Sequence, residues 1–395
     1  MEETRKMNVL VIGSSGAGKS TLIKAISGTD VVTGVGEGNT QNISVYESST
    51  WPLCLIDTKG FEYSKSEQAK TVKQVKQFTK RQIEKSRMDS TVNAGIDAVW
   101  YCVEGTSRRT FSYNLDIMNK AIKNWKSIPV FAVITKSYSE ADVSENIEAV
   151  ERTFGKDKNI NLRGIIPVIA ESYRINEDTI VEPKGIDELC NATLDCSELA
   201  KSISEENRNR MVLQQMRFTA NMYTAGATAA AIVVGAAPIS FADSLLLVPL
   251  ETSLTKSILK IYKVDFSGDL ITAIVGSAAI TNIAKAALSA LKTIPNIAGS
   301  VLNAVVAGFF VAALGEAVIA VAEAMKQGKI SKEKIDSVVA FVSDKLKDNA
   351  VFGFAIKYLE DNAEKLQGKS AKDVFKLVEK AVKDEANSVK TLIKK

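Results

Sequence analysis

The sequence of 395 residues contains no histidine. This absence excludes Ser–His and Cys–His nucleophile pairs, and it excludes the usual zinc sites, which contain histidine. Any chemistry of this chain must therefore use Lys, Ser, Thr, carboxylates, backbone amides and Mg²⁺.

Cysteine is scarce, and the four residues are scattered along the chain. Cys54 and Cys102 lie inside apolar runs typical of strands, so we expect buried thiols there. We expect no signal peptide ahead of the first motif. The expected location is therefore the reducing cytoplasm, with a peripheral position at a membrane as one option.

The charge excess is small, since 50 basic and 46 acidic residues leave a formal net charge of +4. This balance does not argue for nucleic acid as a partner, and we predict none. Apolar residues make up 46% of the chain and charged residues 24%, which is typical of globular domains. Length and composition predict a domain over 1–200 and a second over 201–395.

A glycine-rich motif follows the first apolar run. Residues 13–20 read GSSGAGKS, which fits the phosphate-loop spacing of Gly, four residues and Gly-Lys-Ser. Glycine allows consecutive N–H groups to turn toward a phosphate, and a following helix adds its positive N-terminal end. Residues 8–12 predict a buried strand, and 20–27 predict a helix that stops at Gly28. This order argues against a chance glycine-rich turn.

The candidate phosphate-binding residues are Gly13, Ser14, Ser15, Gly16, Ala17, Gly18, Lys19, Ser20 and Thr21. Lys19 is expected to reach the outer phosphates, and the Ser20 hydroxyl is expected to bind Mg²⁺. A phosphate loop alone does not separate a kinase, an ATPase and a GTPase, so the motifs downstream must decide.

An apolar strand in the segment WPLCLIDTKGFE ends at Asp57-Thr58-Lys59-Gly60. An aspartate there can hold Mg²⁺ through water, and the N–H of Gly60 can contact a terminal phosphate. The preceding segment, TGVGEGNTQNIS, is polar and glycine-rich, which is typical of a mobile loop. Thr40 is the candidate switch threonine that completes the Mg²⁺ shell, and Thr33 is the competing candidate. An ordinary solvated loop is the alternative.

Three further apolar runs, at 95–105, 127–137 and 165–172, predict buried strands. Helical patterns lie at about 66–88, 111–125, 140–154 and 185–200. Strands that alternate with helices predict an α/β domain with a mostly parallel sheet and helices on both faces. Ligands of such sheets bind at the carboxyl ends of the strands, where all these motifs fall.

In this order, the motifs resemble those of a regulatory GTPase domain of the translation-factor-related class, which includes Era-like, septin-related and dynamin-related proteins. The resemblance covers about the first 200 residues and adds the base-side motifs Thr135-Lys136 and Ala170-Glu171-Ser172. It implies that GTP or GDP is the ligand and that the domain is a switch that relaxes after hydrolysis.

The resemblance also assigns roles around the terminal phosphate. It implies that Lys19, Thr40 and Gly60 contact this phosphate, and that Mg²⁺ is held by Ser20 and Thr40, with Asp57 in its outer shell. Phe61 follows Gly60 where many such switches carry a glutamine that orients water. This change implies slow turnover or catalytic groups supplied from elsewhere.

The base-reading motif of this class is Asn/Thr-Lys-x-Asp, and here Tyr138 stands where the aspartate is expected. A phenol cannot replace the paired acceptors of a carboxylate, and Glu140 or Asp142 can substitute only if the loop bends. Lys136 can still lie along the base, and Ala170 can still offer its N–H to a guanine oxygen. The resemblance favours GTP, and ATP stays open.

The second half of the chain is rich in Ala and Gly. Residues 218–242 and 293–315 carry no charge and are long enough to raise the question of a membrane. Both contain proline and little Leu or Ile, which favours a compact helical domain with buried hairpins over spanning helices. A hairpin that inserts when nucleotide binds is the third option. The tail predicts three amphipathic helices, at 331–347, 350–366 and 371–393.

Residues 220–325 resemble the helical region of a bacterial GTPase family of unknown function, on the segments APISFADSLLLVPLETSLTKSILKIYKV and LKTIPNIAGSVLNAVVAGFFVAALGEAV. The layout is similar to that of immunity-related GTPases, which act at membranes and oligomerise. It implies a homodimer through the nucleotide domain and a membrane or protein effector at the helical domain. We therefore expect a slow GTPase switch. A nucleotide-binding module with little turnover and an ATP-using enzyme are the alternatives.

Overall fold

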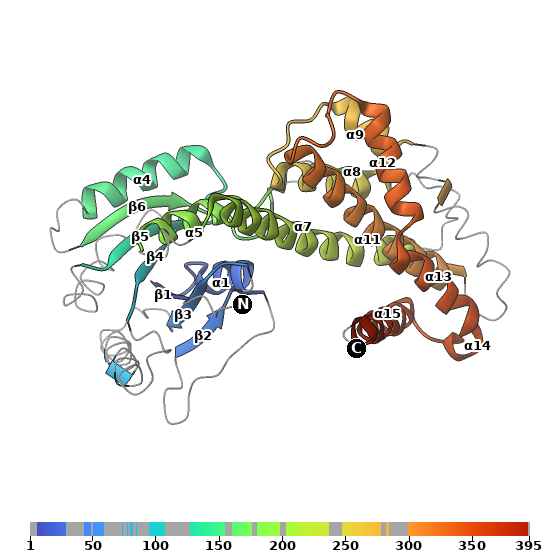
Figure 1. Ribbon diagram of the computed structural model, residues 1–395, viewed down its shortest axis with the longest axis horizontal. Helices are drawn as coiled ribbons and strands as arrows, with labels where there is room; N and C mark the ends of the chain where they lie inside the picture. The colour runs from blue at the N-terminus through green and yellow to red at the C-terminus, as the bar shows by residue number, and fades with distance from the viewer. Residues whose placement is uncertain are drawn as a thin grey trace. The chain divides into compact units, whose positions relative to one another are not determined.

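The computed structural model describes two compact units, Met1–Gln215 and Met216–Lys395 (Figure 1). It describes residues 6–28, 43–48, 50–58, 95–106, 127–154, 160–175, 180–197, 203–236, 247–277, 282–283 and 299–393, and also residues 73, 77, 80, 81 and 84. The division falls within the long helix α7 (Glu205–Gly235). The domain boundary after residue 200 stays a prediction.

The first unit is built around a six-stranded sheet with strand order β2-β3-β1-β4-β5-β6. The strands are β1 (Met7–Gly13), β2 (Ile43–Glu47), β3 (Leu53–Thr58), β4 (Ala98–Glu104), β5 (Pro129–Thr135) and β6 (Asn161–Pro167). All neighbours pair in parallel except β2, which is antiparallel to β3. The predicted α/β class with a mostly parallel sheet is confirmed.

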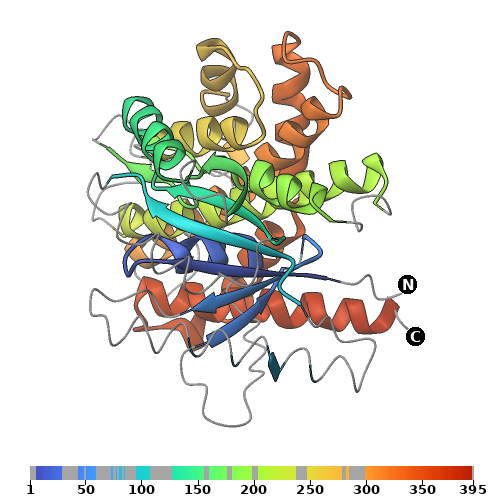
Figure 2. The same cartoon turned by 90° about the vertical axis from the view of Figure 1, so that its left-hand side faces the viewer.

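Helices cover both faces of this sheet, as predicted (Figure 2). Val9 and Val11 of β1 pack in a core with α1 (Lys19–Ser27) and α5 (Ile186–Asp195). Leu10 and Ile12 point to the opposite core, which contains Val150 of α4 (Glu140–Phe154). Because successive strand residues alternate between faces, a strand covered on both sides must be apolar throughout.

Two strand predictions need correction. The polar loop was expected to continue to residue 44, but the edge strand β2 already begins at Ile43. The sequence does not show this strand as an apolar run, because an edge strand need not be apolar on both faces. The last strand begins at Asn161 instead of residue 165 and ends at Pro167, since β6 is also an edge strand and most of its residues are only half-buried. A small hairpin, β7 (Tyr173–Arg174) and β8 (Ile180–Val181), follows and was not predicted.

The helix predicted over 140–154 matches α4, and the one predicted over 185–200 ends earlier, at Asp195. The helix predicted over 111–125 lies outside the described residues. That predicted over 66–88 lies mostly outside them, with residues 73, 77, 80, 81 and 84 helical.

The second unit is helical in its described part, as predicted. Its helices are the remainder of α7, α8 (Val248–Ile261), α9 (Gly268–Val275), α11 (Gly299–Lys326), α12 (Ile335–Lys347), α13 (Ala350–Asp361), α14 (Ala363–Leu366) and α15 (Ala371–Ile393). The helix predicted over 350–366 is interrupted at Asn362, and the one predicted over 371–393 matches α15. The helix predicted over 331–347 begins at Ile335.

The helix α11 is the core of this unit and packs against α8, α12, α13 and α15. Glycines let α7 approach it closely, because a Cβ built on Gly315 would lie 2.3 Å from Cγ2 of Thr224. Within the described part of the chain, α11 alone is long and apolar enough to cross a membrane, and 83% of its most apolar stretch is buried. Burial in a helical bundle accounts for this composition, so α11 is weak evidence for a membrane.

Candidate nucleotide-binding site

The phosphate loop lies between β1 and α1, as the sequence predicts. Gly18 has a φ of 75°, and a Cβ on it would lie 3.2 Å from Cβ of Thr135. A Cβ on Gly13 would lie 2.5 Å from the carbonyl oxygen of Cys102 in β4. Both positions therefore need glycine, one for its backbone conformation and the other for the close approach of a neighbouring strand.

The other loop residues differ in exposure. Ala17 is buried, Ser14 and Thr21 are half-buried, and Ser15, Gly16 and Ser20 are exposed. The exposed edge of the loop and the first turn of α1 are therefore accessible to a phosphate, and α1 points its N-terminus toward that edge.

Lys19 is only 7% exposed and folds back over the loop. Its Nζ donates to the carbonyl oxygens of Gly13, at 3.1 Å, and Ser14, at 2.9 Å. These bonds place an ammonium charge at the rim of the loop.

Asp57 lies in β3 beside the phosphate loop, because its register partner in β1 is Val11 and β1 ends at Gly13. It is half-buried, and Ser20 is exposed in the first turn of α1. A hydroxyl is an oxygen ligand of the kind that Mg²⁺ prefers, and a carboxylate beside it can hold the ion through water. The described residues hold no cluster of three or more His, Cys, Asp or Glu that suits a metal.

Cys102 lies in β4 against the loop, and burial raises the pKa of its thiol to about 12. Cys54, in β3, is half-buried, and its thiol pKa is raised to about 11 by burial. Both thiols stay protonated at neutral pH, so neither is a nucleophile. The expectation of a buried thiol is confirmed for Cys102.

Thr40 and Gly60, the predicted contacts of the terminal phosphate, lie outside the described residues, as do Thr33 and Phe61. Their roles stay predictions. The strands next to them in the sequence are described. β2 begins at Ile43, shortly after Thr40, and β3 ends at Thr58, shortly before Gly60.

The base-side motif is tied directly to the phosphate loop. The Thr135 hydroxyl, at the end of β5, donates to the carbonyl oxygen of Ala17 at 2.8 Å and lies 3.0 Å from that of Val103. Lys136 follows with a φ of 53° and forms an ion pair with Glu104, at the end of β4. The structure thus brings Thr135 and Lys136 to the same sheet edge as Lys19.

Tyr138 stacks on Tyr173, with ring centroids 4.0 Å apart and planes at 13°. Burial raises the pKa of Tyr138, and the charges of Glu171, Tyr173 and Glu104 raise it further. Sequence reasoning missed Tyr173. Its only signal was an aromatic residue directly after Ala170-Glu171-Ser172.

Ala170 and Glu171 follow β6 at the carboxyl end of the sheet, where the β6–β5 pairing continues as a bond from the N–H of Val168 to the carbonyl oxygen of Ile134. Ala170 is half-buried and Glu171 is exposed. Glu140 and Asp142 lie in the first turn of α4.

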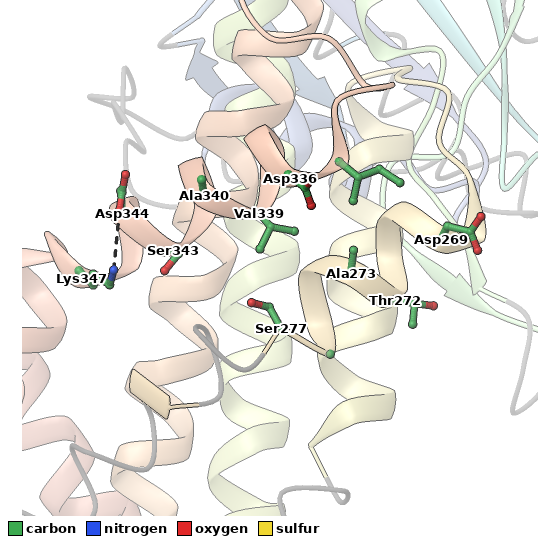
Figure 3. Close-up of a pocket in the computed structure, with 12 residues that line it drawn as sticks. Asp269, Thr272, Ala273, Ser277, Asp336, Val339, Ala340, Ser343, Asp344 and Lys347 are labelled. Carbon is green, nitrogen blue, oxygen red and sulfur yellow. Dashed lines mark ion pairs between the residues drawn. The ribbon is translucent and has the colours of Figure 1, made fainter.

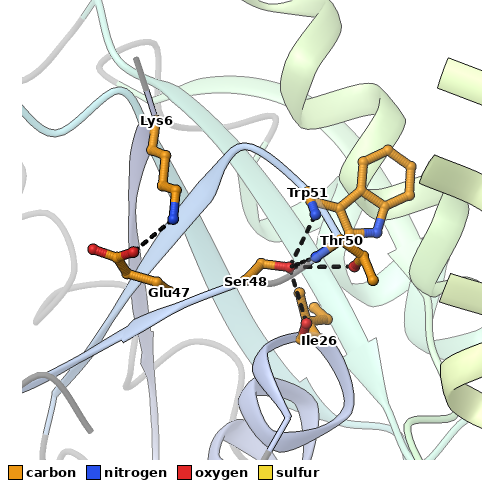
Figure 4. A network of polar contacts seen from close by, with 6 residues as sticks. All are labelled: Lys6, Ile26, Glu47, Ser48, Thr50 and Trp51. Carbon is orange, nitrogen blue, oxygen red and sulfur yellow. Dashed lines mark hydrogen bonds and ion pairs between the residues drawn. The ribbon is translucent and has the colours of Figure 1, made fainter. Parts of the chain in front are cut away.

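The turn between β2 and β3 is bound to α1 by a buried network (Figure 4). The Ser48 hydroxyl donates to the carbonyl oxygen of Ile26 at 2.9 Å and accepts from the N–H of Trp51 at 3.1 Å. Gln215 of α7, 2% exposed, completes the network. Its Oε1 accepts from the Trp51 indole at 3.1 Å, and its Nε2 donates to the carbonyl oxygen of Ala25 at 2.8 Å.

A groove of about 700 Å³ lies between α9 and α12 in the second unit (Figure 3). Asp269, Asp336 and Asp344 line it, and Lys347 pairs with Asp344 at 3.9 Å. Three carboxylates against one ammonium disfavour an anionic nucleotide. The phosphate loop is therefore the candidate nucleotide site.

Residues 8–136 match the protein family described as 50S ribosome-binding GTPase. The match contains the phosphate loop, Asp57 and Thr135-Lys136, so the first unit carries a P-loop GTPase domain, and the match supports a guanine nucleotide as its ligand. No relative among curated proteins matches this chain.

Several solved structures are similar at low identity. The apo elongation factor SelB from Methanococcus maripaludis is 18% identical over 50% of this chain and 34% of its own, with a TM-score of 0.32. The G domain of the FeoB iron transporter from T. maritima is 15% identical over 48% and 98%, with a TM-score of 0.30. The septin GTPase domain from Chlamydomonas reinhardtii is 16% identical over 52% and 96%, with a TM-score of 0.32. This chain spans about a third of the elongation factor. The assignment depends on the family match and not on these three structures.

Proposed function

We propose that this chain is a slow GTPase that acts as a nucleotide-dependent switch, and that its helical unit turns the nucleotide state into oligomerisation or into contact with a membrane or protein partner. The GTPase domain supports the nucleotide part of this proposal. The contact of Gln215 with Trp51 supports the switch. It joins the turn between β2 and β3, the strands next to the predicted switch residues, to α7, which continues into the second unit.

The phosphates are proposed to bind along Gly13 to Ser20. Lys19 would exchange its two carbonyl partners for phosphate oxygens. Ser20 and Thr40 would hold Mg²⁺, with Asp57 in its outer shell, and the ion would neutralise phosphate charge when bound. Thr40 and Gly60 are proposed to close on the terminal phosphate.

Hydrolysis is proposed to be slow in the isolated chain, because Phe61 cannot orient water as a glutamine does. A second copy is proposed to supply the missing catalytic group through a dimer of nucleotide domains. Turnover per molecule measured against protein concentration tests this step. Dimer-activated hydrolysis rises with concentration, whereas a module with little turnover stays flat.

The switch signal is proposed to pass along β2 and β3. In the sequence, Thr40 comes just before β2, and β3 ends at Thr58, just before Gly60. The turn between these strands is bonded to α1 through Ser48 and to α7 through Gln215. Closure of the switch loops would therefore pull on α7.

Amide hydrogen exchange tests this route, comparing the GDP state with a non-hydrolysable GTP analogue. We expect the analogue to change exchange at 43–58 and along α7 together. Gln215→Ala should keep the first change and lose the second. Gln214→Ala, at the exposed neighbour, is the matched control and should keep both. Lipid co-sedimentation in the two nucleotide states tests the membrane option.

Calorimetric titration with GDP and with ADP tests the ligand. We expect GDP to bind, ADP to be silent, and Lys19→Ala to abolish binding. Lys24→Ala, at an exposed position of the same helix, should bind GDP normally. ADP binding as tight as GDP binding would support the ATP-using alternative and contradict the switch proposed here.

A further inference from the structure

Tyr138 and Tyr173 join two loops at the carboxyl edge of the sheet. Tyr138 follows β5 and Tyr173 begins β7 after β6, and their rings stack 4.0 Å apart. Tyr173 is 46% exposed although it is a large aromatic residue. The pair therefore presents an accessible flat aromatic surface beside the proposed nucleotide site.

The phosphate loop fixes where a base can lie. Asp57 and β3 lie on one side of the loop, where Mg²⁺ and the terminal phosphate are proposed to bind. Thr135 holds the other side through its bond to Ala17. A nucleotide with its phosphates in the loop must therefore extend its base toward the ends of β5 and β6, where the two tyrosines are.

The loop that carries Tyr138 is held in one conformation. The Ser137 hydroxyl donates to the carbonyl oxygen of Ile134 at 2.6 Å, and the Tyr138 N–H donates to that of Lys136 at 2.8 Å. The ion pair with Glu104 also holds the side chain of Lys136 in place. A bend that would bring a later carboxylate to this place has to break these contacts.

The edge of guanine presents two donors, the ring N1–H and the 2-amino group, and a site that reads both needs paired acceptors. Glu104 is engaged by Lys136. Glu171 is near enough to raise the pKa of Tyr138, but it is exposed, so water competes for its carboxylate. The phenol of Tyr138 offers a single hydroxyl.

Building on the proposed function, we propose that this site holds the base by its flat face on the Tyr138–Tyr173 pair and does not read the 2-amino group. Guanine and hypoxanthine nucleotides, which share the 6-oxo group and differ only in that amino group, then bind alike. Tyr138 and Tyr173 supply this stacking surface, and the single hydroxyl of Tyr138 leaves the 2-amino group unread.

Calorimetric titration of the full chain with GDP and with IDP tests the inference. We expect the two dissociation constants to agree within about threefold, whereas a charge-assisted pair of bonds to the edge would separate them by about tenfold or more. Tyr138→Asp should make GDP bind more tightly than IDP by about tenfold or more. Ser139→Asp, which adds the same charge one residue later, should not. Tyr173→Ala should weaken both nucleotides together by about tenfold, and Tyr173→Phe, which keeps the ring, should not.

Two results would overturn the inference while the proposed function stands. The first is GDP binding at least tenfold tighter than IDP in the unmodified chain, with Glu171→Gln removing the difference, which would make Glu171 the reader. The second is Tyr173→Ala binding both nucleotides normally. Binding of neither GDP nor IDP would instead contradict the proposed function, and this inference with it.

Discussion

The side-chain amide of Gln215 accepts the indole hydrogen of Trp51 at 3.1 Å, across 164 positions of the sequence. Both residues are 2% exposed. The same amide donates to the carbonyl oxygen of Ala25, at the end of the helix that follows the phosphate loop. One buried side chain of α7 thus binds both the β2–β3 turn and α1.

Gln215→Ala is expected to lower the free energy of unfolding of the first unit by about 3 kcal/mol, because it leaves a buried indole N–H and a buried carbonyl without their partner. Urea unfolding followed by tryptophan fluorescence measures this change. Gln214→Ala removes an exposed amide of the same size and should shift the midpoint little. Equal midpoints for the two variants would contradict the prediction.

Gly315→Ala is expected to destabilise the helical unit by about 2 kcal/mol, since the added Cβ would lie 2.3 Å from Cγ2 and 2.6 Å from Oγ1 of Thr224. Thermal unfolding followed by circular dichroism measures it. Gly353→Ala is the matched control in another helix. Apart from its chain neighbours and its own helix backbone, no described atom lies within 4 Å of its Cβ position, so alanine should stabilise α13 by about 0.5–1 kcal/mol. A stabilising Gly315→Ala would disprove the close α7–α11 contact.

Glu251 is expected to make stability depend on pH. Burial in α8 raises the pKa of its carboxyl from 4.5 to about 7. The folded chain keeps this proton where the unfolded chain loses it. The stabilising contribution is therefore full below about pH 4.5, falls as the pH rises, and is lost above about pH 7.

Glu251→Gln should remove this dependence. At pH 8 the variant should be more stable than the unmodified chain by about 2 kcal/mol, and at pH 4 the two should be equal. Urea unfolding at the two pH values measures the difference. Glu316→Gln, at an exposed position of α11, is the control. A pH-independent difference for Glu251→Gln would show that the carboxyl is solvated.

The parallel strands were predictable because both faces of the sheet are covered. Val9 and Leu10 are buried on opposite faces, so the strand shows in the sequence as an unbroken apolar run. The edge strand β2 carries no such signal, since Ser44 is half-buried and Glu47 is exposed. A period of two over five residues is too short to stand out beside a glycine-rich loop.

The candidate site was predictable where chemistry fixes the spacing. The phosphate loop needs its glycines and Lys19 at set positions, whatever the rest of the fold. Tyr173 and Gln215, in contrast, belong to no motif with a fixed spacing. Tyr173 stacks on a ring 35 positions away in the sequence, and Gln215 lies beside a charged segment that is typical of a solvated helix. Tertiary packing alone brings these two residues to their contacts.

The expected cytoplasmic location stays a prediction.

The helix α11 has no polar stripe, because its neighbours in the bundle surround it. A helix of this kind cannot fold alone in water, and its neighbours cannot bury their own apolar faces without it. The helical unit should consequently form in one cooperative step, with no stable half. Removal of the chain after Lys326 would strip α12, α13 and α15 from α11 at once. We expect such a truncated chain to aggregate rather than to retain a smaller bundle.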